Sequence, residues 1–262
     1  MSTTGAGGSV PAVLARGLWK RFGRTTAAAG VDLYVPAGSF FGLVGPNGAG
    51  KTTTLSMLTG LLRPDAGSAL VDGVDVWADP LEIKRRIGVL PEGLRLFERL
   101  TGSELLTYVG RLRRLPAAEI ESRTAELLSV LDLAATGDTL VVDYSTGMRK
   151  KIALAAALLH NPRVLFLDEP FEGVDPVSAR VIRAVLERYT TTGSTVVFSS
   201  HVMELVERLC DAVGVISAGR VVASGPLDVV RGDRSLEDVF VELVGAGGPD
   251  EKNLSWLGSS PR

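Results

Sequence analysis

The segment 45–53 constrains the fold more than any other part of this sequence. It reads Gly-Pro-Asn-Gly-Ala-Gly-Lys-Thr-Thr and satisfies the pattern Gly-x-x-x-x-Gly-Lys-Ser/Thr, in which glycines let backbone N–H groups turn inward around phosphate oxygens. An apolar run at 40–44 precedes the segment, and leucines at helical spacing follow it within 51–62. We therefore expect a strand, a phosphate-binding loop and a helix in succession. That context disfavours the alternative, a glycine turn with an incidental lysine.

This loop supplies the first candidate site residues. Lys51 is expected to reach the β- and γ-phosphates of a nucleotide, and the hydroxyl of Thr52 is expected to bind Mg²⁺. The helix that begins here would direct its positive N-terminal end at the same anion. The residues predicted to surround the phosphates are Gly45, Pro46, Asn47, Gly48, Ala49, Gly50, Lys51, Thr52 and Thr53.

A second candidate segment, 163–170, reads as an apolar strand that ends in two carboxylates, Asp168 and Glu169. A buried strand can hold Asp168 against a metal ion and present Glu169 to a water molecule. Mg²⁺ bound by an Asp and by the threonine of the phosphate loop is a recurring arrangement in nucleotide-hydrolysing enzymes. Taken alone, the segment could equally be a turn at the end of a strand. Its position downstream of the phosphate loop favours the metal and water roles.

The distribution of strand and helix patterns predicts an α/β domain with a helical insertion. Short apolar runs separated by turn residues make 13–44 rich in β-structure. Helical periodicity replaces this pattern within about 94–159. Three further apolar runs, at 164–167, 195–198 and 212–216, are separated by helices, as in a parallel sheet with crossover helices.

Composition narrows the class of protein. A chain of 262 residues, 45% of them hydrophobic, can bury a sizeable core, and we expect an ordered body at 11–244 between flexible tails at 1–10 and 245–262. With 28 Lys plus Arg against 30 Asp plus Glu and no long basic run, a nucleic-acid partner is not expected. The longest apolar stretches, such as 152–159, fall short of the roughly 18–20 residues of a membrane span. Cys210 is the only cysteine, so no intrachain disulfide can form and a reducing compartment is expected.

These segments, in this order, resemble the nucleotide-binding domains of ATP-binding-cassette (ABC) transporters. The most specific match is 144–148, Tyr-Ser-Thr-Gly-Met, directly before a helical run. In the family this signature reads Leu-Ser-Gly-Gly-Gln and binds the γ-phosphate held by the opposite subunit. Ser145 and Gly147 match it, and the other three positions depart. The resemblance implies that Ser145 and Gly147 contact the partner's nucleotide, whereas Ser145 taken alone would favour the alternative, the N-cap of a core helix.

The resemblance implies an α/β fold, with a P-loop NTPase (RecA-like) core, a small antiparallel β region and an inserted helical lobe. The ABC ATPase domain would cover 11–244, with the lobe at about 94–159. ATP and Mg²⁺ are the implied ligands, and ATP hydrolysis is the implied reaction, with Lys51, Glu169 and His201 in catalysis. His201 follows a predicted strand and matches the family's switch histidine, which contacts the γ-phosphate. The alternative for it is a structural histidine.

Three further positions match the family less specifically. Phe22 occupies the place of the aromatic residue that stacks on adenine, with a core aromatic as the alternative. Asp175 matches the loop that crosses to the partner subunit, with an Asp-Pro helix start as the alternative. Glu92 stands where the family usually has Gln, beside the metal. A carboxylate can also ligate Mg²⁺, so Glu92 is grouped with Thr52 and Asp168 as a candidate ligand, against the alternative of a solvated loop glutamate.

The resemblance also implies partners and a location. The chain has one phosphate loop and no predicted membrane span, so two copies are expected to pair head to tail when ATP binds. A separate membrane-spanning permease would supply the pathway and hold the chain at the cytoplasmic face of the cell membrane. The sequences of segments 144–151 and 235–240 resemble those of ABC-2-type subunits that export drugs and polysaccharides. This resemblance favours export.

Two other classes of protein stay open. A soluble ABC ATPase that acts as a mechanical switch on ribosomes or DNA would carry two cassettes or a long coiled-coil insertion, and this sequence has neither. A regulatory nucleotide-binding module would need neither Ser145 nor Glu169. A GTPase is disfavoured because the sequence contains no Asn-Lys-x-Asp segment to read the base.

Overall fold

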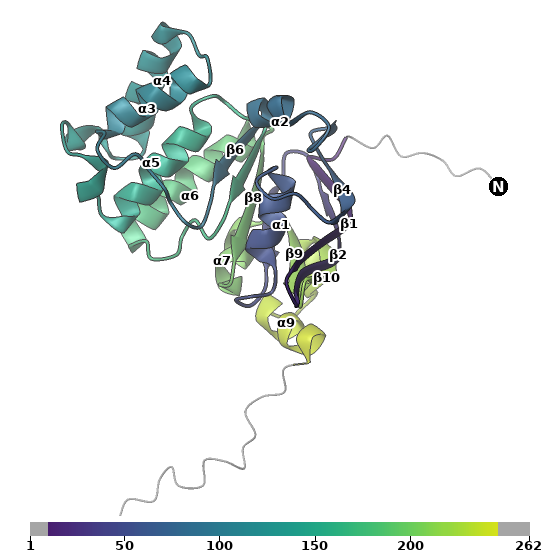
Figure 1. The fold of residues 1–262 in the computed structure, drawn as a ribbon. Helices are drawn as coiled ribbons and strands as arrows, with labels where there is room; N and C mark the ends of the chain where they lie inside the picture. Colours follow the sequence, from purple (N-terminus) through teal and green to yellow (C-terminus); the bar gives the residue numbers. More distant parts are fainter. Residues whose placement is uncertain (1–9, 246–262) are drawn as a thin grey trace, which may run out of the picture.

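The computed structural model describes residues 10–245. Its centre is a six-stranded sheet with the strand order β10-β9-β3-β8-β7-β6 (Figure 1). Neighbouring strands from β9 to β6 run parallel, whereas β10 pairs antiparallel with β9. Parallel strands are covered on both faces, which explains why the central ones, β3, β8 and β7, are buried along their whole length and mostly apolar. The six strands are β3 (Phe40–Val44), β6 (Ile87–Leu90), β7 (Val164–Leu167), β8 (Thr195–Ser200), β9 (Ala212–Ser217) and β10 (Arg220–Pro226).

A four-stranded antiparallel sheet, with the order β2-β1-β4-β5, packs over one face of this centre. The helix α1 (Lys51–Leu58) contacts β1, β2 and β4, and its buried residues join one core cluster with side chains from both sheets. The helix that follows the phosphate loop is thus fixed by packing on the antiparallel sheet. The strands of this sheet are β1 (Val13–Phe22), β2 (Thr25–Val35), β4 (Ala66–Val71) and β5 (Val74–Asp75).

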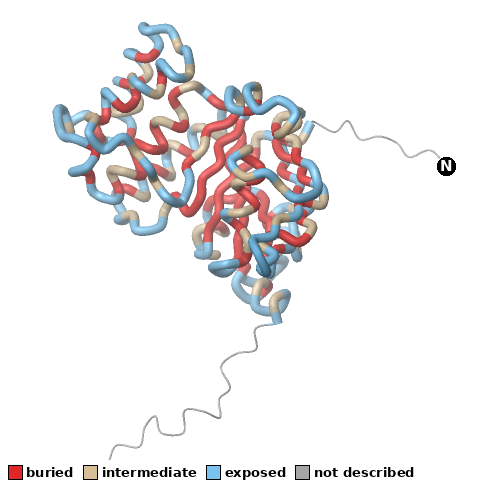
Figure 2. Tube along the Cα trace, in the orientation of Figure 1, coloured by how far each residue is buried: buried red, intermediate tan, exposed pale blue. Residues whose placement is uncertain are grey.

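The second core cluster lies on the other face of the large sheet and extends among the helices between β6 and β7. Figure 1 shows α3 and α4 farthest from the sheets, with α5 and α6 between them and the strands. Figure 2 shows the buried residues as a band along the strands, which the outlying helices continue on their inner faces. These helices are α3 (Gly102–Leu112), α4 (Ala117–Val130), α5 (Thr146–Leu158) and α6 (Pro176–Thr191).

Short helices complete the described chain. A helix before β6 is capped by Asp79, and the last one is capped by Ser235, whose hydroxyl accepts from the Asp238 N–H. Between residues 10 and 245, no helix combines the length and apolar composition needed to cross a bilayer. The remaining elements are α2 (Pro80–Arg86), η1 (Ala134–Thr136), η2 (Val141–Asp143), α7 (Met203–Leu209), α8 (Leu227–Arg231) and α9 (Leu236–Val244).

The structure confirms the predicted fold class and modifies some boundaries. The helix expected over 51–62 ends at Leu58, because the N–H groups of Leu61 and Leu62 turn back to the carbonyl of Ser56. The helix after the signature begins at Thr146, a little earlier than the helical run suggests. Of the tails expected at 1–10 and 245–262, only Val10 and Gly245 belong to the described residues.

The parallel arrangement brings several chain segments to one edge. The strands β3, β6, β7 and β8 are parallel neighbours, so the loops after their carboxyl ends meet at the same side of the sheet. In open α/β sheets this is the edge where ligands bind. The phosphate loop, Glu92, the Asp168–Glu169 pair and His201 each follow one of these strands.

Candidate active site

The phosphate-binding loop connects β3 to α1, as predicted. Gly50, the N-cap of α1, has a φ of 105°. A Cβ at this position would overlap the carbonyl oxygen of Ala27, so only glycine allows the loop to pack here. Among the described residues no side chain caps α1, and its first turn has no acidic residue. The first N–H groups of the helix therefore remain available to an anion.

Lys51, the first residue of α1, is buried and points across the loop. Its Nζ donates to the carbonyl of Gly45 at 2.8 Å and to that of Pro46 at 3.3 Å. The same atom lies 3.3 Å from Oε1 of Glu169. The ammonium thus lies within the concave side of the loop, where phosphate oxygens are expected, and it already contacts the candidate catalytic carboxylate.

Asp168 and Glu169 follow the last residue of β7, and a buried hydroxyl joins them. The Ser199 Oγ donates to Oδ1 of Asp168 at 2.5 Å and accepts the Glu169 N–H at 2.9 Å. Burial raises the pKa of Asp168, while the hydrogen bond from Ser199 opposes that rise. A bound cation would favour the ionised form of this carboxylate.

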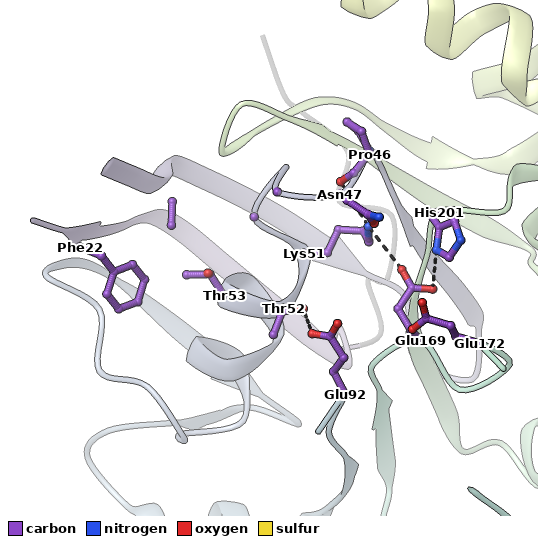
Figure 3. A pocket seen from close by; sticks show the side chains of 13 residues that line it. Phe22, Pro46, Asn47, Lys51, Thr52, Thr53, Glu92, Glu169, Glu172 and His201 are labelled. Carbon is purple, nitrogen blue, oxygen red and sulfur yellow. Dashed lines mark hydrogen bonds and ion pairs between the residues drawn. The ribbon is translucent and has the colours of Figure 1, made fainter. Parts of the chain in front are cut away.

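The Glu169 carboxylate lies between two positively charged or chargeable groups (Figure 3). Oε2 is 3.1 Å from Nδ1 of His201, which follows β8. Oε1 faces Lys51 and accepts no hydrogen bond from any described residue. The structure therefore brings together Lys51, Glu169 and His201, the three residues expected to take part in catalysis. Glu169 Oε1 keeps an acceptor available, as a base that deprotonates water requires.

Glu92 lies beside Thr52 at the mouth of the loop. Its Oε2 accepts from the Thr52 Oγ1 at 3.2 Å, and both residues line a small cavity that Asp168 also borders. Hydroxyl and carboxylate oxygens are suitable ligands for Mg²⁺. Among the described residues no group of three or more His, Cys, Asp or Glu side chains forms a complete metal cage. Magnesium sites of nucleotide enzymes are usually completed by substrate phosphates and water, so this donor set fits such an ion.

A cavity of about 340 Å³ joins these groups. Cavities of this size are typical of small-molecule sites. In Figure 3 the half-exposed Phe22 lies at one end of the cavity, and Glu169 and His201 lie at the other. This arrangement would let a ring stack at one end while phosphates reach the loop. The cavity is lined by Phe22, Ala27, Pro46, Asn47, Gly48, Gly50, Lys51, Thr52, Thr53, Glu92, Glu169, Glu172 and His201.

The signature residues lie elsewhere. Ser145 is the N-cap of α5, where its Oγ accepts from the Met148 N–H at 3.3 Å. A Cβ on Gly147 would lie 2.7 Å from the Ser178 Oγ and 2.9 Å from the Asp175 Oδ2, so this position packs closely on the start of α6. None of Ser145, Gly147 and Asp175 belongs to the described lining of the cavity. Within one chain, these three residues lie outside the candidate nucleotide cavity.

Asp175 is the N-cap of α6 in the structure. Its Oδ1 accepts from the N–H groups of Val177 at 3.0 Å and Ser178 at 2.9 Å. These bonds, first those with Ser178, lower the pKa of Asp175. The helix-start alternative thus describes its contacts within the chain, and a contact with a partner copy stays a prediction.

Sequence reasoning missed three residues that the structure places near the site. They are Ser199, Glu172 and Lys150, whose Nζ donates to the Glu169 carbonyl at 2.7 Å. Ser199 has no distinguishing signal, because Ser200 stands next to it at the end of the same strand, before His201. Lys150 stands in a run of three basic residues, between Arg149 and Lys151, so the sequence neither distinguishes it from its neighbours nor identifies its partner.

The fold and the site define a nucleoside triphosphatase with a phosphate-binding loop. The family described as "ABC transporter" matches residues 28–172. The chain is 40% identical over 236 residues to "Daunorubicin resistance ATP-binding protein DrrA3" of Streptomyces coeruleorubidus, over 90% of this chain and 75% of that protein. It is 37% identical over 211 residues to "Linearmycin resistance ATP-binding protein LnrL" of Bacillus subtilis, over 80% of this chain and 68% of that protein.

A solved structure titled "Structure of ATP binding subunit of ABC transporter" matches with a TM-score of 0.82 and 30% identity, and the match covers 88% of this chain and 98% of that one. This chain belongs to the ABC transporter family and is an ATP-binding ATPase subunit of it. The resemblance inferred from the signature and the phosphate loop is thereby confirmed.

Proposed function

We propose that this chain is the ATPase subunit of an exporter, in which ATP-driven pairing of two copies moves a substrate through a separate membrane-spanning permease. The observation that carries the proposal is the convergence of Lys51, Glu169 and His201 at one end of the cavity. A cation that binds phosphate, a carboxylate with an open acceptor oxygen and a ring that can donate to phosphate are groups suited to hydrolysis of a γ-phosphate.

Nucleotide binding follows from the shape and charge of the cavity. The uncapped start of α1 donates N–H groups to phosphate oxygens, and Lys51 neutralises the β- and γ-phosphates. Phe22 stacks on the adenine ring at the opposite end of the cavity. Stacking is available to every purine, so this contact does not by itself select adenine.

The chemical step depends on Glu169. Its carboxylate orients a water molecule and accepts a proton as the water oxygen bonds to the γ-phosphorus and the bond to the bridging oxygen breaks. His201 lies beside that carboxylate and donates to the γ-phosphate oxygens. Thr52, Asp168 and Glu92 would hold Mg²⁺, which when bound neutralises the phosphate charge.

Pairing of two copies explains the residues that lie outside the cavity. The N-terminal end of α5, with Ser145 and Gly147, is an anion-binding end without a ligand in its own chain. In the proposed dimer it closes the nucleotide site of the second copy, with Asp175 at the same contact. Each copy then contributes to both sites, and hydrolysis releases the pair.

Export and the permease are inferred from the relatives. Two of them carry names of drug-resistance ATP-binding proteins, and a third, 41% identical over 218 residues, is the "Nod factor export ATP-binding protein I" of Ralstonia nicotianae. ABC ATP-binding subunits work with membrane permeases, and we infer that this chain acts at the cytoplasmic face of the membrane through such a permease.

Isolation from native membranes tests the proposal. The tagged Glu169→Gln chain, held with Mg-ATP, should co-purify with a multi-spanning protein in a fixed ratio, and the unmodified complex should hydrolyse ATP. If the tagged chain stays entirely in the aqueous fraction while the unmodified chain hydrolyses ATP, the soluble-switch alternative is correct. If the unmodified chain and its complex hydrolyse no ATP, the assignment of the site is wrong.

A further inference from the structure

A buried lysine lies next to the candidate catalytic carboxylate, and the hydrolysis proposed above does not use it. Lys150 belongs to α5 and is 6% exposed. Its Nζ donates to the backbone carbonyl of Glu169 at 2.7 Å. Burying an ammonium group is unfavourable unless it is bonded or paired. Desolvation lowers the pKa of Lys150, and the charges of Glu172 and Asp168 oppose this.

The carbonyl that Lys150 contacts belongs to a backbone conformation that few residues adopt. Glu169 has a φ of 45°, in the left-handed region that disfavours side chains with a Cβ. Such a conformation persists only when its surroundings hold it. At Glu169 both backbone polar groups are held, the N–H by Ser199 Oγ and the C=O by Lys150 Nζ.

The direction of the Glu169 side chain depends on this backbone conformation. From it, the carboxylate reaches Lys51 Nζ at 3.3 Å and His201 Nδ1 at 3.1 Å. A change in φ at this residue would swing both oxygens away from the phosphate loop. The contact with Lys150 therefore acts on the reacting carboxylate through the main chain, without touching the substrate.

The helix that carries Lys150 also connects Glu169 to the signature segment at the start of α5. Ser145 caps this helix, and Lys150 follows five residues later, about 7.5 Å along the axis. A helix of this length moves as a rigid unit over so short a distance. Any shift at Ser145 and Gly147 is therefore passed to the Lys150 ammonium and to the carbonyl that it holds.

We propose that Lys150 is a positioning residue that connects the partner-facing end of α5 to Glu169 of the same chain. This inference rests on the proposed function, in which the start of α5 contacts the nucleotide of the second copy. Engagement of α5 at one nucleotide site then sets the carboxylate of the other site. The two sites of the dimer are coupled through a buried hydrogen bond within each chain.

The neighbouring Lys151 offers a matched control. It lies on the same helix, carries the same charge and is 4% exposed. Its Nζ is 3.8 Å from Oδ2 of Asp132, in the loop after α4, and not at Glu169. Replacement of Lys150 or Lys151 by Met keeps similar length and apolar volume while it removes the ammonium.

The test uses mixed dimers in which only one carboxylate can act. A reporter chain with an intact Glu169 is mixed with an excess of Glu169→Gln carrier chain in Mg-ATP, and phosphate release is measured. Lys150→Met is placed first in the reporter and then in the carrier. In the reporter it should lower kcat about tenfold to a hundredfold, the effect of a misplaced catalytic group, with KM nearly unchanged. In the carrier it should have little effect.

The outcomes separate positioning from a merely structural role. If Lys150 only stabilises α5 for contact with the other site, the loss occurs with Lys150→Met in the carrier, and the proposal is wrong. Equal loss in both arrangements, or the same loss with Lys151→Met in the reporter, also overturns it. If Lys150→Met does not fold, Lys150→Gln replaces it, because its shorter side chain cannot reach the carbonyl, and the same outcomes decide.

Failure of the proposed function gives a different result. In that case the unmodified dimer hydrolyses no ATP, or the Glu169→Gln homodimer is fully active. If instead Glu169→Gln is inactive and Lys150→Met in the reporter turns over like the unmodified chain, the function stands and only the link through Lys150 is lost.

Discussion

The Lys51 ammonium lies 3.3 Å from Oε1 of Glu169, so the cation proposed to hold the phosphates and the carboxylate proposed to activate water form one buried ion pair. Opposite charges at this distance attract strongly where little water screens them. The phosphates of ATP compete with Glu169 for Lys51. We expect productive binding to replace this pair with a contact between Lys51 and phosphate, which leaves Glu169 beside His201.

The two members of this pair should separate binding from chemistry. Lys51→Ala should weaken ATP binding and hydrolysis together, because it removes the charge that neutralises the phosphates. Glu169→Gln keeps the shape but removes the base, so kcat should fall about 10²–10⁴-fold while ATP affinity is kept. Binding of a fluorescent ATP analogue and phosphate release measure the two effects. Normal turnover by Glu169→Gln would show that this carboxylate is not the base.

ATP should control the association of two chains. The Glu169→Gln chain should be largely monomeric alone and dimeric with Mg-ATP, because Ser145 and Gly147 lie outside the cavity of their own chain and are proposed to bind the phosphate of a second copy. Light scattering gives the mass directly. Lys51→Ala serves as the control and should stay monomeric under the same conditions. An unchanged mass for Glu169→Gln with and without Mg-ATP contradicts the shared-site arrangement.

Glu92 should act through an oxygen donor and not through its charge. Its Oε2 accepts from Thr52 Oγ1 at 3.2 Å, and the amide oxygen of Gln can make the same bond. Glu92→Gln should therefore keep most of the ATPase activity, whereas Glu92→Ala should bind ATP but lose about tenfold or more in hydrolysis, because a metal ligand and its reach are lost. Titration of activity with Mg²⁺ should show the larger requirement for the Ala variant. Unchanged activity in Glu92→Ala would identify a solvated loop carboxylate.

His160 should make stability depend on pH. Burial, together with the charge of Arg113, lowers the pKa of His160 from 6.5 to about 4, and its Nε2 lies 2.9 Å from the Ile87 carbonyl. Between these two values the unfolded chain binds a proton that the folded chain does not. The contribution to stability is therefore complete above pH 6.5 and is lost as the pH falls toward 4, by about 1–2 kcal/mol at pH 5 after allowance for partial exposure.

Urea unfolding at pH 7 and pH 5 measures this effect. The His160→Gln chain lacks the titrating group but can still donate to the Ile87 carbonyl, so its free energy of unfolding should fall less between the two pH values. Carboxylates contribute equally to both chains and cancel in the difference. Identical pH dependence of the two chains would mean that His160 titrates normally in the folded state.

Several parts of the site could be predicted because they are encoded in contiguous residues. The loop at 45–53 combines glycines with Lys51 and Thr52, and its strand and helix neighbours have their own periodicities. The pair Asp168 and Glu169 follows an apolar run. Each of these segments depends on local backbone preferences, which a short stretch of sequence expresses directly.

Other parts could not be predicted because their partners are main-chain atoms or distant residues. Lys150 binds a carbonyl oxygen of Glu169, and every residue has such an oxygen, so no pattern of side chains points to it. Ser199 joins the Asp168 carboxylate to the Glu169 N–H only because β7 and β8 are parallel neighbours. The early end of α1 also depends on a main-chain atom, because the N–H groups of Leu61 and Leu62 donate to the Ser56 carbonyl.

The sequence by itself determined the phosphate loop, the residue types of the site and the alternation of strands and helices, since these follow from spacing and local conformation. Only the tertiary structure decided that Lys51, Glu169 and His201 meet. It also decided that Ser145 and Gly147 lie outside the cavity of their own chain. The physical reason is that strand order and helix packing depend on burial summed over the whole core, which no single segment specifies.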